Sequence, residues 1–515
     1  MPPRGRRGTT GITLLLACLI CGCAQLPPIE GRLPVTAVAP DESGPVARAV
    51  EPLTQGHPGK SGIALLSDGR VAFGVRVRLA RQAAKSIDIQ TYIWHEDATG
   101  TLLFEEMMQA ARRGVRVRIL LDDANSTRKI DPILTLLARE PNVEVRLYNP
   151  FVGRGSKAIG FLTDFDRLNH RMHNKSFTVD NRVTIVGGRN IADEYFEAGQ
   201  ETGLVDLDAV AVGEVVPEVS SEFDLYWNSP SAYAATQILA NVKPIAAQEL
   251  TQRAQSVIAS PKAAVFADAI AQTEQVKQLL TGTLDLQWTT ARVINDDPAK
   301  TLQPVPESEV QLLPKLRAAL GDPQSSLDLI SPYFVPGPNG SAALEAIARR
   351  GVQVRVVTNS LAATDVSSVH AGYSKYRVRL LQAGVKIYEL KQDAVPIEKR
   401  AKQTGSSATA GLHAKSYAVD RSRIFVGSFN LDPRSSKLNT EMGMVIDSPV
   451  FAARLAQAVD NAFPDVAYRV TLKDEADLRW EDGAKGETYT TEPETGWWQR
   501  LSVRVQSWLP IEWLL

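Results

Sequence analysis

His173-Asn-Lys175-Ser-Phe-Thr-Val-Asp180 and His413-Ala-Lys415-Ser-Tyr-Ala-Val-Asp420 are two copies of one pattern, H-x-K-x-x-x-x-D, in a chain of 515 residues. A glycine-containing turn that ends in asparagine follows each copy: Gly187-Gly-Arg-Asn190 in the first and Gly427-Ser-Phe-Asn430 in the second. The histidine and the lysine of each copy are two positions apart, so on a β-strand they point to the same face. Each copy therefore brings an imidazole, an ammonium group and an amide to one place.

The segments that precede the two motifs are also repeated. Strand patterns are found in Ser86-Ile-Asp-Ile-Gln-Thr-Tyr-Ile-Trp94 and in Ser326-Leu-Asp-Leu-Ile-Ser-Pro-Tyr-Phe334. A helical stretch follows each of them and ends in the tetrapeptide Ala-Arg-Arg-Gly. A second strand pattern follows that glycine, over residues 115–121 and 352–357. Glycine commonly caps a helix at its C-terminus, and a crossover helix joins parallel strands. We therefore predict an α/β fold of two tandem sandwich repeats.

Two copies of the motif supply the groups that displacement at a phosphodiester requires. One histidine can attack phosphorus and become phosphohistidine, while the other protonates the leaving alkoxide and later deprotonates the incoming alcohol or water. The negative charge of the phosphoryl group can be held by two lysines and two amides, those of Lys175, Lys415, Asn190 and Asn430. Because one copy offers only one histidine, we predict a single active site assembled from both copies.

A metal centre is the main alternative interpretation of a histidine motif. Lysine is not a metal ligand, and the three cysteines of the chain, Cys18, Cys21 and Cys23, all lie near its N-terminus. The body of the chain therefore has no thiolate for a metal site. We predict that the protein uses no metal and no cofactor.

The paired motifs resemble those of the phospholipase D superfamily, and the resemblance extends from Ser61 to about Asp465. It implies that the two repeats form a pseudo-dimer with one shared active site. It also implies that His173 and His413 are the nucleophile and the general acid/base, with His173 favoured as the nucleophile. Asp180 and Asp420 are implied to brace the site, and Asn190, Asn430 and the motif lysines to bind the phosphate.

In the same superfamily an acidic residue further along the chain orients each histidine. Glu441 matches this position for His413, and Asp206 or Asp208 matches it for His173. The resemblance therefore implies that each acid serves the histidine of its own repeat. The alternative interpretation is that these acids lie at the end of a strand and face solvent.

Within the superfamily, the stretches Gln90-Thr-Tyr-Ile-Trp94 and Thr358-Asn-Ser-Leu-Ala-Ala-Thr-Asp365 resemble bacterial cardiolipin synthases of the branch without N-terminal membrane helices. This implies transfer of a phosphatidyl group from phosphatidylglycerol or phosphatidylethanolamine to phosphatidylglycerol. The motifs do not choose between alcohol and water as acceptor, so a hydrolase of phospholipid or nucleic acid is an alternative. A non-enzymatic envelope lipoprotein is another. The net charge of −1 favours a phospholipid partner over nucleic acid.

Residues 1–23 have the features of a lipoprotein-type signal peptide: arginines at the start, an apolar run, and then small residues around cysteine. Ile20-Cys-Gly-Cys23 resembles the bacterial lipobox, which makes Cys23 the predicted lipidated residue. An uncleaved N-terminal membrane anchor is the alternative. Both interpretations place the body in the bacterial cell envelope, on the periplasmic side of a membrane.

The remaining chain divides by composition and pattern. We predict a proline-rich tether (24–60), a first repeat (61–230), a helical connector (231–300), a second repeat (301–465) and a C-terminal extension (466–515). In the extension, tryptophans and aliphatic residues between Trp497 and Leu509 recur at helical spacing. This predicts an amphipathic helix that lies on a membrane surface or, alternatively, packs against the protein body.

Three polar residues follow the second repeat's parallel strand, where open α/β sheets tend to bind ligands. They are Asp365, His370 and Tyr373. They are candidates for lining a lipid pocket, with ordinary loop residues as the alternative. The sequence leaves the oligomeric state open.

Overall fold

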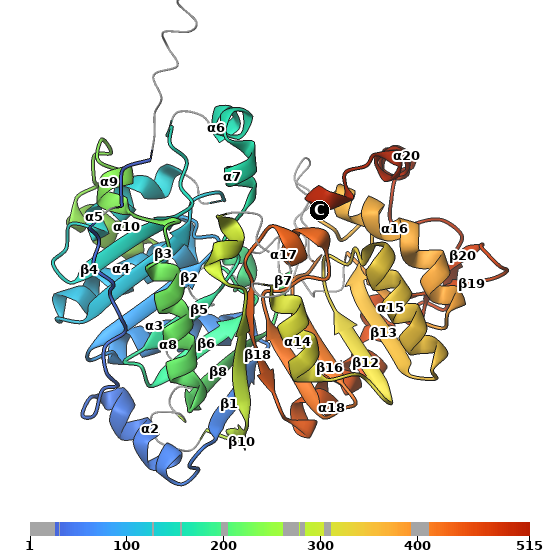
Figure 1. The fold of residues 1–515 in the computed structure, drawn as a ribbon, viewed down its shortest axis with the longest axis horizontal. Helices are drawn as coiled ribbons and strands as arrows, with labels where there is room; N and C mark the ends of the chain where they lie inside the picture. The colour runs from blue at the N-terminus through green and yellow to red at the C-terminus, as the bar shows by residue number, and fades with distance from the viewer. Residues whose placement is uncertain are drawn as a thin grey trace, which may run out of the picture.

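The computed structural model describes residues 26–29, 31–125, 128–154, 157–196, 204–260, 278, 284–302, 311–392 and 411–515. Two α/β halves lie side by side, each built on one large sheet (Figure 1). The first sheet runs through β10 (Gln287–Thr289), β1 (Ser61–Leu66), β8 (Asp208–Gly213), β6 (Val183–Gly187), β5 (Ser176–Val179), β2 (Ser86–Thr91), β3 (Arg116–Asp122), β4 (Val143–Tyr148) and β9 (Ala232–Ala234). The second runs through β11 (Ala291–Asn295), β18 (Met442–Ile446), β17 (Arg423–Gly427), β16 (Lys415–Val419), β12 (Ser326–Ile330), β13 (Gln353–Asn359), β14 (Lys386–Leu390), β19 (Ala467–Leu472), β20 (Leu478–Asp482) and β21 (Glu487–Tyr489).

The predicted strand–helix–strand units are present in both halves. Strand β2 is parallel to β3, and β12 is parallel to β13, with α4 (Ala98–Arg112) and α15 (Gly337–Arg349) as the crossover helices. Gly114 and Gly351 follow these helices with φ of +91° and +88°, a conformation that glycine adopts at little cost. The same buried ion pair joins the two parallel strands in each half, Arg118 with Asp88 and Arg355 with Asp328. The predicted α/β class and the tandem repeat are therefore confirmed.

Each motif aspartate ends a strand and ties its hairpin to the start of a neighbouring strand. The carboxylate of Asp180 accepts hydrogen bonds from the backbone N–H groups of residues 84–86, where β2 begins, at 2.7 to 3.1 Å. The carboxylate of Asp420 accepts the equivalent bonds from residues 324–326, where β12 begins. Both aspartates have positive φ, +53° and +52°, which aspartate tolerates better than most residues. These contacts fix the strands that carry the histidine–lysine pairs.

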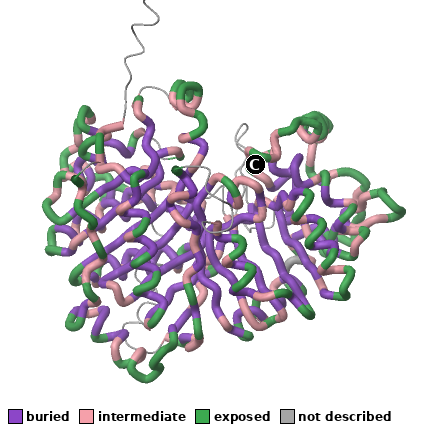
Figure 2. Tube along the Cα trace, in the orientation of Figure 1, coloured by how far each residue is buried: buried purple, intermediate pink, exposed green. Residues whose placement is uncertain are grey.

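The two halves meet through the faces of their sheets. One apolar core contains residues of both repeats, among them Ile63, Val186 and Ala211 of the first and Ile424, Met444 and Ile446 of the second. Figure 2 shows the strands at this junction buried along their length. Because each sheet covers the other, the ends of β5 and β16, where the motifs lie, are held at one place.

The segment predicted as a tether, residues 24–60, is instead part of the first repeat from residue 31 onward. Arg32 donates to the backbone oxygens of Asn228 and Ser229, and α2 (Pro45–Gln55) buries Val46 and Val50. One of the prolines that suggested a tether, Pro45, occupies the first turn of α2, where its missing N–H costs nothing, whereas Pro52 lies inside the helix. Cys23 and the rest of residues 1–25 lie outside the described residues.

The connector predicted over 231–300 is only partly helical. The helix α10 (Ala247–Ile258) packs on α4, but β9 and β10 extend the first sheet and β11 forms an edge of the second. In the C-terminal extension, β19 to β21 lengthen the second sheet, and the predicted helix is α20 (Trp497–Trp508), which is followed by η5 (Glu512–Leu514). No helix in the described parts of the chain is both long and apolar enough to cross a bilayer.

The two motif aspartates should differ in their contribution to stability. Asp180 is fully buried and Asp420 is partly exposed, so water can replace only the second carboxylate. We expect Asp180→Ala to lower the free energy of unfolding by about 3 kcal/mol, because it leaves backbone N–H groups without an acceptor. The matched change Asp420→Ala should cost clearly less. Denaturant titration measures the free energy of unfolding of both variants. Equal losses of stability would contradict the idea that the more buried aspartate contributes more.

Candidate active site

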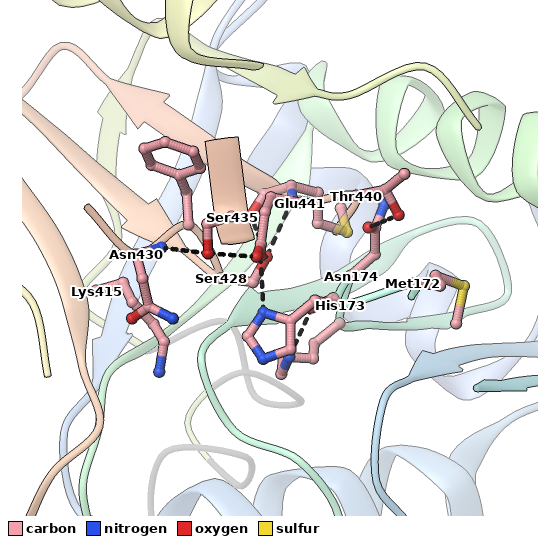
Figure 3. A network of polar contacts seen from close by, with 12 residues as sticks. Met172, His173, Asn174, Lys415, Ser428, Asn430, Ser435, Thr440 and Glu441 are labelled. Carbon is pink, nitrogen blue, oxygen red and sulfur yellow. Dashed lines mark hydrogen bonds and ion pairs between the residues drawn. The ribbon is translucent and has the colours of Figure 1, made fainter. Parts of the chain in front are cut away.

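The two histidine–lysine pairs lie together at the junction of the repeats. His173 and Lys175 directly precede β5, while His413 stands between β15 (Gly411–Leu412) and β16, which Lys415 begins. Figure 3 shows His173 and Lys415 around the same space. The close approach has an electrostatic effect as well: burial lowers the pKa of His173 most, and both lysines and His413 lower it further. The sequence prediction that both copies form one site agrees with this arrangement.

The repeats exchange backbone hydrogen bonds beside each histidine. Next to His173, the N–H of Thr440 donates to Arg171 O at 2.9 Å, and the N–H of His173 donates to Thr440 O at 2.8 Å. Next to His413, β15 pairs in parallel with β7 (Leu204–Val205), and the N–H of His413 donates to Val205 O at 2.8 Å. In both cases the contacted residue, Thr440 or Val205, directly precedes an acid. Each histidine is therefore aligned with an acid of the other repeat.

The acid–histidine pairs cross between the repeats. The Nδ1 atom of His173 is 2.8 Å from Oε2 of Glu441, and the Nδ1 atom of His413 is 2.6 Å from Oδ2 of Asp206. The prediction that each acid serves its own repeat was therefore wrong. The motif order along the chain identifies the acids, but the backbone pairing at the junction decides which histidine each acid faces.

Asp208, the alternative orienting residue, does not contact a histidine. Its Oδ2 atom lies 2.9 Å from Arg76 and 3.3 Å from Arg189, and all three side chains are buried. The side chain of Arg189 in turn donates to the backbone oxygens of residues 66, 67 and 206. Asp208 thus holds an arginine that supports the turn before Asn190, and Asp206 is the orienting acid.

The two orienting acids have different surroundings. Burial raises the pKa of Glu441 to about 7, although hydrogen bonds from the hydroxyl groups of Ser428 and Ser435 oppose the rise. Burial would also raise the pKa of Asp206, but His413 and Lys415 outweigh it and hold the pKa below its usual range. The site is therefore asymmetric, although the motifs are nearly identical.

The difference at the second position of the two turns explains how each acid fits. Position 188 is glycine because a Cβ there would lie 2.2 Å from Oδ1 of Asp206. The matching position in the second repeat is Ser428, whose hydroxyl donates to Glu441. Glycine thus makes room for the shorter acid, and serine binds the longer one.

The charged groups of the site are strongly perturbed by burial. Burial lowers the pKa of His173 well below its usual value, and that of His413 as well, although Asp206 opposes the second shift. Burial likewise lowers the pKa of Lys175 to about 7 and that of Lys415 to about 8. An imidazole whose Nδ1–H faces a carboxylate presents the lone pair of Nε2. Both histidines can therefore act as nucleophile or base at neutral pH.

The motif lysines bond to the backbone of their own histidines, and both asparagines predicted to bind phosphate are buried. Lys175 Nζ donates to His173 O at 2.6 Å, and Lys415 Nζ donates to His413 O. The Oδ1 atom of Asn190 accepts from the N–H of Ile93, which fixes the amide. Within the described part of the chain, Nδ2 of Asn190 and Oδ1 of Asn430 are buried without a hydrogen-bond partner. Buried polar atoms normally have partners. Nδ2 of Asn190 can donate to an anionic oxygen, whereas Oδ1 of Asn430 can only accept a hydrogen bond.

Several residues that contact the histidines were not identified from the sequence. Tyr92 meets the ring of His173 edge-on at 4.9 Å between centroids, and Tyr195 meets His413 in the same way at 5.0 Å. Tyr92 lies in the stretch Gln90–Trp94, which was quoted for its resemblance to the family, but no role was predicted for it.

A buried hydrogen-bond chain behind His173 had no sequence signal at all. The side chain of Asn174 donates to Glu222 at 2.6 Å. It also accepts from the hydroxyl of Thr440 at 3.0 Å (Figure 3). Glu222 lies on α8 (Val215–Trp227), and burial raises its pKa to about 8. This chain links the first repeat to the residue that precedes Glu441.

The three candidates for a lipid pocket have other partners. His370 and Tyr373 are buried on α16 (Ser367–Gln382), where they contact Glu492 of the C-terminal extension and Glu389. Asp365 accepts a hydrogen bond from the hydroxyl of Tyr333. The prediction that His370 and Tyr373 line a pocket was wrong, because the extension covers this face of α16.

Among the described residues, no group of three or more histidine, cysteine or acidic side chains could hold a metal ion.

The crossed pairing predicts which histidine responds to each acid. Asp206→Asn should change the imidazole signals of His413 and lower its pKa, because the carboxylate that favours the protonated ring is lost. Glu441→Gln should change the signals of His173 instead. NMR of histidine-labelled protein, assigned with His173→Ala and His413→Ala, measures both effects. The reverse correspondence would contradict the crossed arrangement.

Comparison with known proteins places this site in a family. The family model described as "Cardiolipin synthase, PLD-like domain" matches residues 77–227 and 316–463. "Cardiolipin synthase C" of Escherichia coli (strain K12) is 44% identical over 91% of this chain and 99% of that protein. "Cardiolipin synthase A" of Yersinia pseudotuberculosis is 28% identical over 75% of this chain and 65% of that protein.

A solved structure supports the fold separately. The crystal structure of phosphatidylserine synthase of Haemophilus influenzae Rd KW20 matches with a TM-score of 0.56 at 13% identity, covering 92% of this chain and 100% of that one. At this identity the likeness shows a common fold and no more. Two family-model matches that coincide with the two half-sites, and a relative aligned along nearly the whole chain, show that the chain belongs to the cardiolipin synthase family with phospholipase D-like domains.

Proposed function

We propose that this protein is a phosphatidyltransferase that synthesises cardiolipin through a phosphohistidine intermediate. The observation that carries the proposal is the junction itself, where two histidines, each with Nδ1 beside a carboxylate, adjoin two lysines. Membership of the cardiolipin synthase family supports a phospholipid substrate. Phosphatidylglycerol serves as acceptor, and phosphatidylglycerol or phosphatidylethanolamine as donor.

The asymmetry of the acids supports a division of labour between the histidines. In the first step Nε2 of His173 attacks phosphorus, so that a P–N bond forms while the P–O bond to the leaving headgroup breaks. His413 gives its proton to the leaving alkoxide, and the ionised Asp206 stabilises the imidazolium form that this role needs. The negative charge of the bound phosphodiester favours the same protonated form.

The second step reverses these roles. His413, now neutral, takes the proton from a hydroxyl group of phosphatidylglycerol as its oxygen attacks phosphorus and the P–N bond to His173 breaks. Lys175 and Lys415, with the amides of Asn190 and Asn430, hold the equatorial oxygens in both steps. The lysines supply the positive charge that a metal ion would otherwise bring, so the proposal includes no cofactor.

The proposal places the enzyme at a membrane of the bacterial cell envelope, on its periplasmic side. Ile20-Cys-Gly-Cys23 supports attachment through a lipidated Cys23. A substrate that resides in a bilayer gives such an anchor a purpose, because it keeps the active site near the surface that contains the lipid.

Product analysis tests the proposed reaction. Vesicles of phosphatidylglycerol alone, and of phosphatidylglycerol with phosphatidylethanolamine, should yield cardiolipin when incubated with the purified enzyme and examined by mass spectrometry. The product should still form in EDTA, because the site relies on lysines for positive charge. Phosphatidic acid as the main product would overturn transfer in favour of hydrolysis, and full loss in EDTA that a divalent ion restores would overturn the metal-free mechanism.

A further inference from the structure

Exposed apolar side chains gather on two segments of the molecule. Among the described residues, ten of the seventeen exposed large hydrophobic side chains lie within 159–165 and 497–513. The first group is Ile159, Leu162 and Phe165, and the second includes Trp497, Trp498 and Trp508. Exposed apolar residues are common singly, but such clusters mark surfaces that meet a partner.

The first cluster is carried by a small helical projection. Helix α6 (Lys157–Thr163) has no buried residue and leads into α7 (Phe165–Asn169). Its inner side rests on Phe151, which the ring of Phe161 meets edge-on at 5.4 Å. The outer side presents Leu162, which is 86% exposed. A packed inner side and an apolar outer side give a structured protrusion that exposes hydrophobic residues.

The second cluster lies on α20, which rests on the body by a narrow face. Val503 is the one residue of α20 that is buried, against Leu361 and Ala371. Trp498 and Trp508 are 67% and 74% exposed, and Arg504 is exposed on the same helix. Tryptophan and arginine together are characteristic of a helix at the depth of phospholipid headgroups.

The two clusters stand at one edge of the molecule. Figure 1 shows α6 and α20 at the upper edge, on either side of the junction where α17 (Pro433–Lys437) lies, and Figure 2 shows both exposed. The first described residues of the chain, from Leu26, lie at the same edge (Figure 1). The predicted anchor Cys23 precedes Leu26 by only a few residues.

A single arginine connects both segments to the active site. The Arg434 side chain donates to Leu514 O at 2.9 Å, at the end of the C-terminal extension, and to Oδ1 of Asn169 at 2.7 Å, at the end of α7. The next residue, Ser435, donates to Glu441, the acid that orients His173. The apolar segments are therefore fixed relative to the catalytic groups.

We propose that α6–α7 and α20 form a two-part docking surface for a phospholipid bilayer, which presents the active site to lipids in the membrane. This inference rests on the proposed function, because a lipid substrate is the reason to commit to a bilayer as the occupant. A second protein would be the other occupant of such a surface. The position of the clusters on both sides of the site, and the interfacial tryptophans, favour the bilayer.

Comparing phosphatidylglycerol in vesicles with phosphatidylglycerol dispersed as monomers distinguishes an effect on membrane docking from an effect on the chemical step. On phosphatidylglycerol vesicles, Leu162→Glu and Trp508→Glu should each lower kcat/KM about tenfold, since each removes one large side chain from the membrane. On short-chain phosphatidylglycerol dispersed as monomers, both variants should act like the wild type. The control is Val450→Glu on α18 (Pro449–Gln457), which is exposed at the opposite edge (Figure 1) and should change neither rate.

A binding measurement keeps the test independent of activity and of any lipid anchor. Leu162→Trp should add tryptophan emission that brominated phosphatidylglycerol vesicles quench, whereas Val450→Trp should add emission that they do not quench. Absence of quenching at position 162, or wild-type turnover of vesicles by Leu162→Glu, would overturn the docking surface and leave a protein partner as its occupant. If quenching occurs but no variant makes cardiolipin from either substrate, the proposed function fails while the surface stands.

Discussion

The structure depends on a carboxylate of each repeat reaching the histidine of the other. Burying two histidines and two lysines at one junction is unfavourable, because charged groups lose their hydration. Glu441 and Asp206 offset part of this cost, and the backbone bonds of Thr440 and Val205 hold the acids in place. Since neither repeat contains both members of a pair, neither could form a working half-site alone. The sheet-to-sheet core and the shared site therefore depend on each other.

Within this symmetric frame, small differences give the two histidines different properties. A glycine at position 188 accommodates Asp206, whereas Ser428 binds the longer Glu441. One acid is then a strong ion-pair partner, while the pKa of the other is raised to about 7. An enzyme with a covalent intermediate needs one nucleophile and one proton donor, and a perfectly symmetric site would offer two equal groups. The duplicated motif with unequal acids meets this requirement.

The sequence predicted the fold well because its signals were local and occurred twice. The strand, helix and glycine patterns around Gly114 and Gly351 each predict a pair of parallel strands joined by a helix. The spacing of the motif predicts that histidine and lysine lie side by side. The failures concern contacts between distant segments. The crossed pairing of Glu441 depends on how β18 meets the first repeat, and Glu222 is buried on a helix where an acid is usually exposed. Residues 31–60 show no sustained periodicity in the sequence, yet Arg32 binds them to the first repeat through the backbone oxygens of Asn228 and Ser229, just after α8.

The central claim is that one site uses the two histidines in different roles, and trapping the covalent intermediate tests it most directly. A phosphodiester donor with a good leaving group needs little protonation to depart, so it can load the nucleophile even without the general acid. His413→Ala should therefore accumulate a phosphorylated peptide that contains His173, while His173→Ala should accumulate none. Equal loading of both variants, or near wild-type turnover by either, would contradict a single site shared between the repeats.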